Sequence, residues 1–138
     1  MAMARPKIIP TEENRFFWEQ AREGRLACRR CSRCGVLQHP PMPLCAHCLS
    51  DELETAVLSG RGIVYAFTSV ERVFHPGFAD RLPYTLALVE LAEQKDLRVL
   101  SRIVGCDCEE VEIGMPVQVD FEPLGDWSLP VFRREVSR

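Results

Sequence analysis

Five cysteines and two histidines lie within the 21 residues of segment 28–48, CRRCSRCGVLQHPPMPLCAHC. Two Cys-x-x-Cys pairs that face each other supply four thiolates, which complete the tetrahedral shell of a structural zinc ion. The first three cysteines allow two such pairs, but only the second pair is followed by glycine, which eases the left-handed turn of a zinc knuckle. We therefore predict a closed, non-catalytic zinc site formed by Cys31, Cys34, Cys45 and Cys48.

The other possible metal ligands have simpler explanations. We expect Cys28 to pack as a small apolar residue or to remain free. Because four thiolates already fill the shell, His39 and His47 are expected to face solvent. Cys106 and Cys108 are too far along the chain to join the site and are expected in a loop or in the core. Iron can occupy the same four sulfurs, which would make the chain a rubredoxin-like electron carrier.

No catalytic residue is predicted anywhere in the chain. None of the three histidines stands beside a cysteine or serine nucleophile at a known spacing. The sequence also lacks a glycine-rich phosphate loop of the Walker or dinucleotide-binding type. We therefore expect a protein that binds rather than one that catalyses by itself.

The net charge of the chain bears on which kinds of partner it can bind. The formal net charge is −3, and four thiolates with one zinc ion take it to about −5. Nucleic-acid-binding proteins need a basic surface, so this charge argues against that class. No apolar run of about 18 residues predicts a membrane span. The first residues lack an apolar signal-peptide core, so a cytoplasmic location is expected, where cysteines serve metals better than disulfides.

The elements expected to position these residues are one helix and several strands. Residues 11–23 predict a helix that Thr11 caps and Gly24 ends, with Phe17 and Trp18 on one face. Strands are predicted over 58–74, 84–92, 97–105, 115–122 and 129–133 from their alternating, β-branched-rich sequence, and 106–114 is predicted as a loop or single helical turn. Five strands without long helices between them favour a small antiparallel barrel.

These predictions give a mainly β chain with four parts. An N-terminal helical segment spans 1–24 and a zinc ribbon spans 25–52. A five-stranded barrel spans 53–134, and a tail follows at 135–138.

On these residues the chain resembles the DUF35 family. The matching stretches are FFWEQAREGRL (16–26), CSRCGVLQHPPMPLCAHC (31–48), LSGRGIVYAFTSV (58–70), PYTLALVEL (83–91) and VEIGMPVQVDFE (111–122). The resemblance implies a rubredoxin-like zinc ribbon followed by an OB-fold barrel. The chain departs from the family at Cys28, which the pattern does not require. It also departs at Leu49, where members usually carry glycine, so a strained second knuckle is expected.

The resemblance implies an accessory role in acyl-CoA chemistry. Similar family members are small subunits that associate with thiolase-like enzymes (thiolases, acyltransferases or retro-aldolases) or with MaoC-like enoyl-CoA hydratases. They assemble the complex and help to hold the CoA thioester. We expect a thiolase-like partner in a hetero-oligomer, two plus two because thiolases are dimers. The alternatives are a MaoC-like hydratase partner and, in a different class, an OB-fold nucleic-acid-binding protein.

Two groups of residues are candidates for contact with CoA or with a partner. Guanidinium forks bind phosphates bidentately, and five arginines lie close together in the sequence: Arg22, Arg25, Arg29, Arg30 and Arg33. Aromatic loop residues can line an acyl channel or anchor a partner, which makes Phe74, His75 and Phe78 candidates. The alternatives are that the arginines form a solvated face and that Phe74 and Phe78 cap the barrel.

Overall fold

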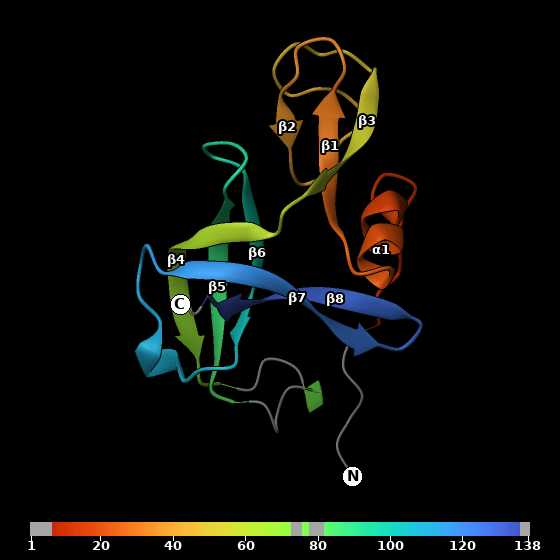
Figure 1. Ribbon diagram of the computed structural model, residues 1–138. Helices are drawn as coiled ribbons and strands as arrows, with labels where there is room; N and C mark the ends of the chain where they lie inside the picture. The colour runs from red at the N-terminus through yellow and green to blue at the C-terminus, as the bar shows by residue number, and fades with distance from the viewer. Residues whose placement is uncertain (1–6, 73–75, 78–81, 136–138) are drawn as a thin grey trace.

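Two sheets and one α-helix make up the fold in the computed structural model, which describes residues 7–72, 76–77 and 82–135 (Figure 1). The elements in chain order are α1 (Arg15–Arg22), β1 (Leu26–Cys31), β2 (Leu37–Gln38), β3 (Leu53–Leu58), β4 (Arg61–Val70), β5 (Tyr84–Leu91), β6 (Arg98–Val104), the 3-10 helix η2 (Cys108–Glu110), β7 (Pro116–Leu124) and β8 (Trp127–Arg134). The structure is mainly β, as predicted. At eight residues, or about 12 Å, α1 is far too short to cross a membrane, and the described residues contain no longer helix.

The first sheet has the order β2-β1-β3 and forms the ribbon. The strand predicted over 58–74 corresponds to β4, except that its first residue, Leu58, belongs to a separate strand, β3, of the ribbon sheet. β3 ends at Leu58 after pairing with β1, and β4 begins at Arg61 in the second sheet. Gly60 makes the break because its φ is +81° and an added Cβ would overlap the side chain of Val119. The predicted residues 73 and 74 lie outside the described part of the chain.

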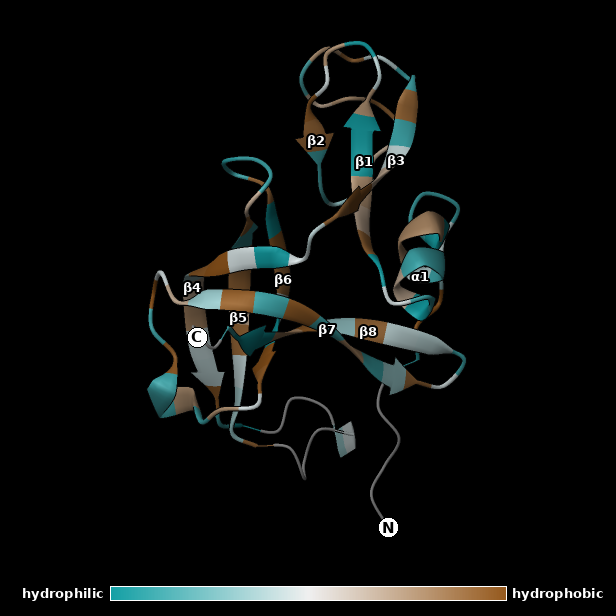
Figure 2. Cartoon of the chain, in the orientation of Figure 1, coloured by the Kyte–Doolittle hydropathy of each residue, from teal (hydrophilic) through white to brown (hydrophobic). Residues whose placement is uncertain are grey.

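The second sheet closes into a five-stranded barrel of order β4-β5-β6-β8-β7. Hydrophobic and hydrophilic residues alternate along β7 (Figure 2), so that one set of side chains points into the barrel. The largest fully buried barrel residues are Val64, Val89, Val117 and Phe132. The predicted antiparallel barrel has one parallel seam, where β6 and β8 pair in parallel over two residues.

Helix α1 is shorter than predicted at its N-terminus. Residues 11–14 form a turn in which the Thr11 N–H donates to Asn14 Oδ1 (2.6 Å) and the Asn14 N–H donates to Thr11 Oγ1 (3.3 Å). This reciprocal pair caps the turn at Thr11, as predicted, but the α-helix itself begins only after Asn14. Gly24 ends it as predicted, with φ at +81°.

The helix packs beside the ribbon and against the barrel. It contacts β1 of the ribbon and β8 of the barrel, as Figure 1 shows. Phe17 and Ala21 are buried on that side, and Trp18 is half-buried with its ring edge-on to Phe17. The predicted aromatic face of the helix therefore joins the two sheets.

A second connection between ribbon and barrel comes from one glutamine. Gln94 lies in the turn between β5 and β6, and its side-chain amide bonds both backbone groups of Leu37 in β2. The Leu37 N–H donates to Gln94 Oε1 (2.9 Å), and Gln94 Nε2 donates to the Leu37 carbonyl (2.7 Å). The amide thus substitutes for a neighbouring strand at the edge of the ribbon sheet.

Replacing Gln94 should loosen the ribbon from the barrel. Gln94→Ala leaves both backbone groups of Leu37 without a partner and is expected to lower the free energy of unfolding by about 1–2 kcal/mol. Urea unfolding followed by circular dichroism measures this loss, and exchange of the Leu37 amide should accelerate. Lys95→Ala, at the exposed neighbouring position, is the matched control. Equal stability of the two variants would contradict the prediction.

Candidate metal centre and the groove beside it

Two tight turns at the end of the ribbon have the same backbone pattern. In the first turn the Gly35 N–H donates to the Cys31 carbonyl at 2.8 Å, and in the second the Leu49 N–H donates to the Cys45 carbonyl at 2.9 Å. The residue at the end of each turn has a positive φ, +79° at Gly35 and +64° at Leu49. This repetition makes two knuckles that face each other.

The knuckles bring together the four predicted ligands, Cys31, Cys34, Cys45 and Cys48. Their Sγ atoms all lie within 4.8 Å of one another, with 3.5 Å between Cys31 and Cys48 and 3.6 Å between Cys34 and Cys45. A tetrahedral zinc ion with Zn–S bonds of about 2.3 Å needs sulfur separations of about 3.8 Å. The sulfur positions therefore fit a structural zinc ion.

Backbone N–H groups favour the thiolate form of the two inner cysteines. The pKa of Cys31 is lowered to about 6, first by the N–H of Cys34. The pKa of Cys45 is lowered first by the N–H of Cys48, 3.4 Å from its sulfur. Thiolates are the form that binds metal. The Val36 N–H lowers the pKa of Cys34, but burial and the neighbouring Cys45 sulfur outweigh it and raise this pKa to about 12, and the pKa of Cys48 is raised as well. Holding all four sulfurs as thiolates at these separations therefore calls for a cation at the centre of the site.

The remaining cysteines lie apart from this site. Cys28 is fully buried in the core, and burial raises its pKa to about 11, so it packs as the predicted small apolar residue. Cys106 and Cys108 are half-buried around η2 at the other end of the barrel strands. Cys106 lies in the loop before η2 and Cys108 begins η2, which agrees with the predicted loop or single helical turn.

The prediction of a solvent-facing histidine is correct at His47 and wrong at His39. His47 is exposed on the second knuckle. The chain after β2 turns back toward α1, which places the ring of His39 against Phe17 with 5.4 Å between ring centres. Burial lowers the pKa of His39, so its ring is neutral near pH 7.

Two of the five predicted arginines lie around the end of α1. The guanidinium of Arg22 stacks over the ring of Trp127, 4.3 Å from its centre, and so ties the helix to β8. Arg25 pairs with Glu23 and also donates to Gln20 at 2.7 Å. These contacts are on the surface of the molecule.

Two more arginines lie on β1, where consecutive side chains point to opposite faces. Arg29 stacks on Phe16 at 3.7 Å and donates to Thr55 at 2.8 Å. Arg30, on the other face, pairs with Glu54 at 2.9 Å. The arginines that lie close in sequence are therefore divided between two faces of the ribbon.

Arg33 is exposed within the first knuckle, and its guanidinium has no ion pair with any described residue. The three predicted loop residues Phe74, His75 and Phe78 lie outside the described part of the chain.

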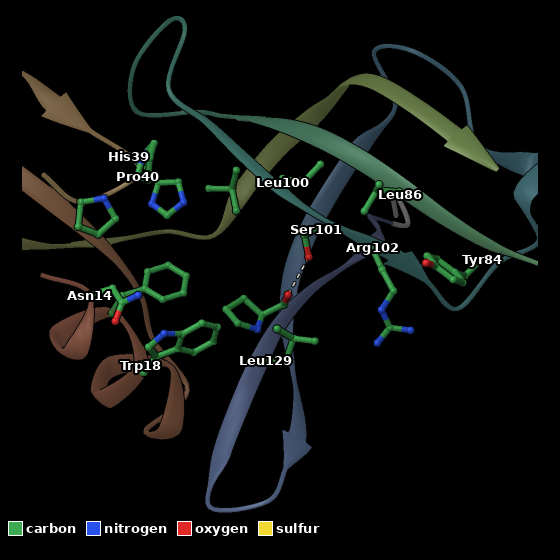
Figure 3. A pocket seen from close by; sticks show the side chains of 14 residues that line it. Asn14, Trp18, His39, Pro40, Tyr84, Leu86, Leu100, Ser101, Arg102 and Leu129 are labelled. Carbon is green, nitrogen blue, oxygen red and sulfur yellow. Dashed lines mark hydrogen bonds between the residues drawn. The ribbon is translucent and has the colours of Figure 1, made fainter. Parts of the chain in front are cut away.

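A groove of about 420 Å³ lies where α1, the segment after β2 and the barrel strands meet. Sequence reasoning missed it, because its walls come from segments far apart in the chain. Figure 3 shows Trp18 and His39 at one end, Leu100 and Leu129 along the sides, and Arg102 with Tyr84 at the other end. The aromatic face of α1 and the His-Pro-Pro sequence were the available signals.

Family models match most of the chain in the expected order. The model described as the ChsH2 rubredoxin-like zinc ribbon domain matches residues 18–54. The model described as the ChsH2 C-terminal OB-fold domain matches residues 55–122. Both agree with the ribbon and barrel described above.

Two curated relatives carry names from acyl-CoA metabolism. A probable enoyl-CoA hydratase alpha subunit of Thermomonospora curvata is 40% identical over 97% of this chain, which spans only 41% of that protein. The benzoylsuccinyl-CoA thiolase subunit BbsA of Geobacter metallireducens is 36% identical over 69% of this chain and 65% of that protein. The chain therefore matches a part of a longer protein in the first case.

A solved structure resembles the chain along its length. A chain of the structure titled Ltp2-ChsH2(DUF35) aldolase superposes with a TM-score of 0.84 and is 40% identical. The match covers 96% of this chain and all of that one.

Metal analysis should find one zinc ion for each chain. Cys45→Ser removes a buried ligand and is expected to lose most of the metal, because three thiolates no longer complete the tetrahedral shell. Cys106→Ser, outside the site, is the control and should keep the full content. Elemental analysis of the purified proteins measures both. Iron in place of zinc, or full metal retention in Cys45→Ser, would contradict the assignment.

Leu49→Gly should stabilise the second knuckle. A positive φ costs a side-chain-bearing residue about 1–2 kcal/mol, and the substitution removes this cost. Glycine is more flexible in the unfolded chain, which offsets part of the gain in folding stability. The expected net gain is about 0.5–1 kcal/mol in urea unfolding of the zinc-bound protein. Gly35→Ala, at the equivalent turn with open space around it, should lose a similar amount. A loss of stability in Leu49→Gly would contradict the prediction that the positive φ at this position is strained.

Proposed function

The chain belongs to the DUF35 family of zinc-ribbon and OB-fold proteins, and we propose that it is a zinc-binding accessory subunit of a cytoplasmic acyl-CoA-processing complex. Its partner in this proposal is a thiolase-like catalytic subunit that carries the reactive groups. The observation that carries the proposal is the match to the DUF35 chain of an aldolase structure, at 40% identity over all of that chain.

Names among the relatives support a thiolase-like partner first and a hydratase partner second. One relative is itself named a thiolase subunit. The relative named a hydratase alpha subunit favours a MaoC-like hydratase as the second candidate, because its match covers 97% of this chain. The match to the hydratase subunit covers only 41% of that relative. The match to the aldolase structure covers the whole of the matched chain. We therefore place the thiolase-like enzyme first.

The proposed roles of the chain are to assemble the complex and to help hold the CoA thioester. Arg33 is exposed and its guanidinium is not paired with a described residue, so it is available to a phosphate. The Arg30–Glu54 pair is half-exposed, and such surface pairs contribute little in water. A phosphate group can therefore replace the carboxylate of Glu54 at little cost.

Reconstitution with the catalytic partner tests this function. A thiolase-like candidate partner is purified alone and with this chain, and cleavage of an acyl-CoA substrate is measured in both cases. We expect at least a tenfold gain in activity from the complex. Cys45→Ser, which loses a zinc ligand, should not give this gain, whereas Cys106→Ser should. Full activity of the partner alone would refute the proposal.

The stoichiometry of the complex is a second readout. If thiolase-like subunits form a central dimer, two copies of this 15.7 kDa chain should join it. Native mass spectrometry distinguishes this two-plus-two complex from other ratios. The same mixing experiment with a MaoC-like hydratase tests the second candidate.

A further inference from the structure

The two edges of the ribbon sheet are protected unequally. The sheet has the order β2-β1-β3, so β2 and β3 are its outer strands (Figure 1). Gln94 covers β2 by bonding both backbone groups of Leu37. β3 pairs with β1 over all six of its residues, and no other described strand pairs with it. The sheet therefore has one covered edge and one bare edge.

One hydrogen bond fixes which backbone groups lie on the bare edge. The Ser32 N–H donates to the Glu52 carbonyl at 2.9 Å, which makes these two residues a hydrogen-bonded pair of the antiparallel ladder. Bonded and non-bonded pairs alternate in such a ladder, so every second residue of β3 after Glu52 bonds to β1. Thr55 and Val57 lie between those residues, and their N–H and carbonyl groups therefore point outward. Among the described residues, no backbone hydrogen bond from outside the ladder reaches them.

β3 has none of the features that usually prevent association at a free edge. Natural edge strands carry lysine or proline, contain a β-bulge, or are covered by another segment. The sequence of β3, LETAVL, has no lysine or proline, and its register with β1 has no shift. Thr55 is exposed, and Val57 is 57% exposed. A regular row of exposed N–H and carbonyl groups is a template for another strand.

We propose that β3 pairs antiparallel with β3 of a second copy of this chain and joins the two ribbon sheets into one, an inference that does not depend on the function proposed above. A twofold axis passes beside Thr55, so that the N–H of each Thr55 donates to the carbonyl of the other. Each Val57 N–H donates to the Leu53 carbonyl of the other copy. The Leu53 N–H already donates to the Asp51 carbonyl at 3.0 Å. The pairing thus adds two bonds at the axis and one on either side of it.

The side chains of β3 complement one another in this register. Residues directly opposite in an antiparallel pair lie on the same face, where their side chains interact. Leu53 of one copy lies opposite Val57 of the other, so that two apolar side chains meet on each side of the axis. At the axis Thr55 faces Thr55, and opposed threonines can share a hydrogen bond. The sequence LETAVL is therefore complementary to itself.

The charges on β3 are also compatible with a second copy. Glu54 is the charged residue of this strand, and it pairs with Arg30 of its own chain at 2.9 Å. In the twofold register Glu54 lies opposite Ala56 of the other copy, so no acid directly faces an acid. An extended segment of another protein is the competing occupant of the edge. The second copy is favoured because it supplies apolar, hydroxyl and uncharged side chains at the positions where β3 presents their complements.

A concentration series of the full zinc-bound chain, measured by analytical ultracentrifugation, tests the proposal. A strand-to-strand contact is at the small end of interface sizes, so we expect a dissociation constant of roughly 10–100 µM. The mass should rise from the 15.7 kDa of one chain toward twice that value. Hydrogen exchange is the second readout. The amides of Thr55 and Val57 should gain protection with concentration, whereas those of Glu54 and Ala56, which bond to β1, should be protected throughout.

Two variants block the edge and leave the ladder to β1 intact. Thr55→Pro removes an outward N–H, a position at which edge strands accept proline. Val57→Lys places a charge opposite Leu53 of the other copy. Each variant should weaken dimerisation at least tenfold. Leu100→Lys, at a similarly exposed apolar position on β6 (61%), is the matched control and should leave the dissociation constant within twofold. Zinc content and circular dichroism confirm that each variant is folded.

A mass of one chain at every concentration overturns the proposal. If the amides of Thr55 and Val57 then become protected only when a catalytic partner is added, a strand of that partner occupies the edge instead. A dimer that persists in both edge variants, or that is lost in Leu100→Lys alone, also overturns the proposal, because another surface then makes the contact. Activation of a catalytic partner is measured separately, so failure of self-association leaves the proposed function standing.

Discussion

Mutual repulsion of four sulfur atoms, relieved by a central cation, is the constraint on which the N-terminal third depends. Two knuckles hold these sulfurs within 4.8 Å of one another. Backbone N–H groups lower the pKa values of Cys31 and Cys45 and so favour their thiolates. The β-structure of the ribbon is small, with a β2 of only two residues, so it offers little packing to hold the knuckles together without a metal.

The metal site is connected to the groove through a short series of hydrogen bonds. The Gln38 side chain donates to the Leu44 carbonyl at 3.1 Å and accepts from the Ala46 N–H at 2.9 Å, which fastens β2 to the second knuckle. The preceding residue, Leu37, is bonded on both backbone groups by Gln94 of the barrel. His39 directly follows Gln38 in the chain. The metal, the barrel and one wall of the groove are therefore coupled.

The sequence predicted the features that depend on local spacing and failed on those that depend on distant contacts. The knuckles and the five barrel strands could be read from short motifs and alternation. The assignment of β3 to the ribbon could not, because it depends on pairing with β1 and on the turn at Gly60. The contact between Leu37 and Gln94 joins residues 57 apart. His39 was missed for the same reason, since α1 covers it only after the chain folds.

Hydrogen exchange of the full chain, with zinc bound and after its removal, tests most directly whether the metal holds the ribbon and the wall of the groove. The account predicts that amides of residues 31–50 lose protection when zinc is removed, while those of β5 and β6 in the barrel keep theirs. Unchanged protection over 31–50, or equal loss over the whole chain, would contradict it. In the first case the ribbon would hold its shape without a metal, and in the second the barrel would have no stability of its own.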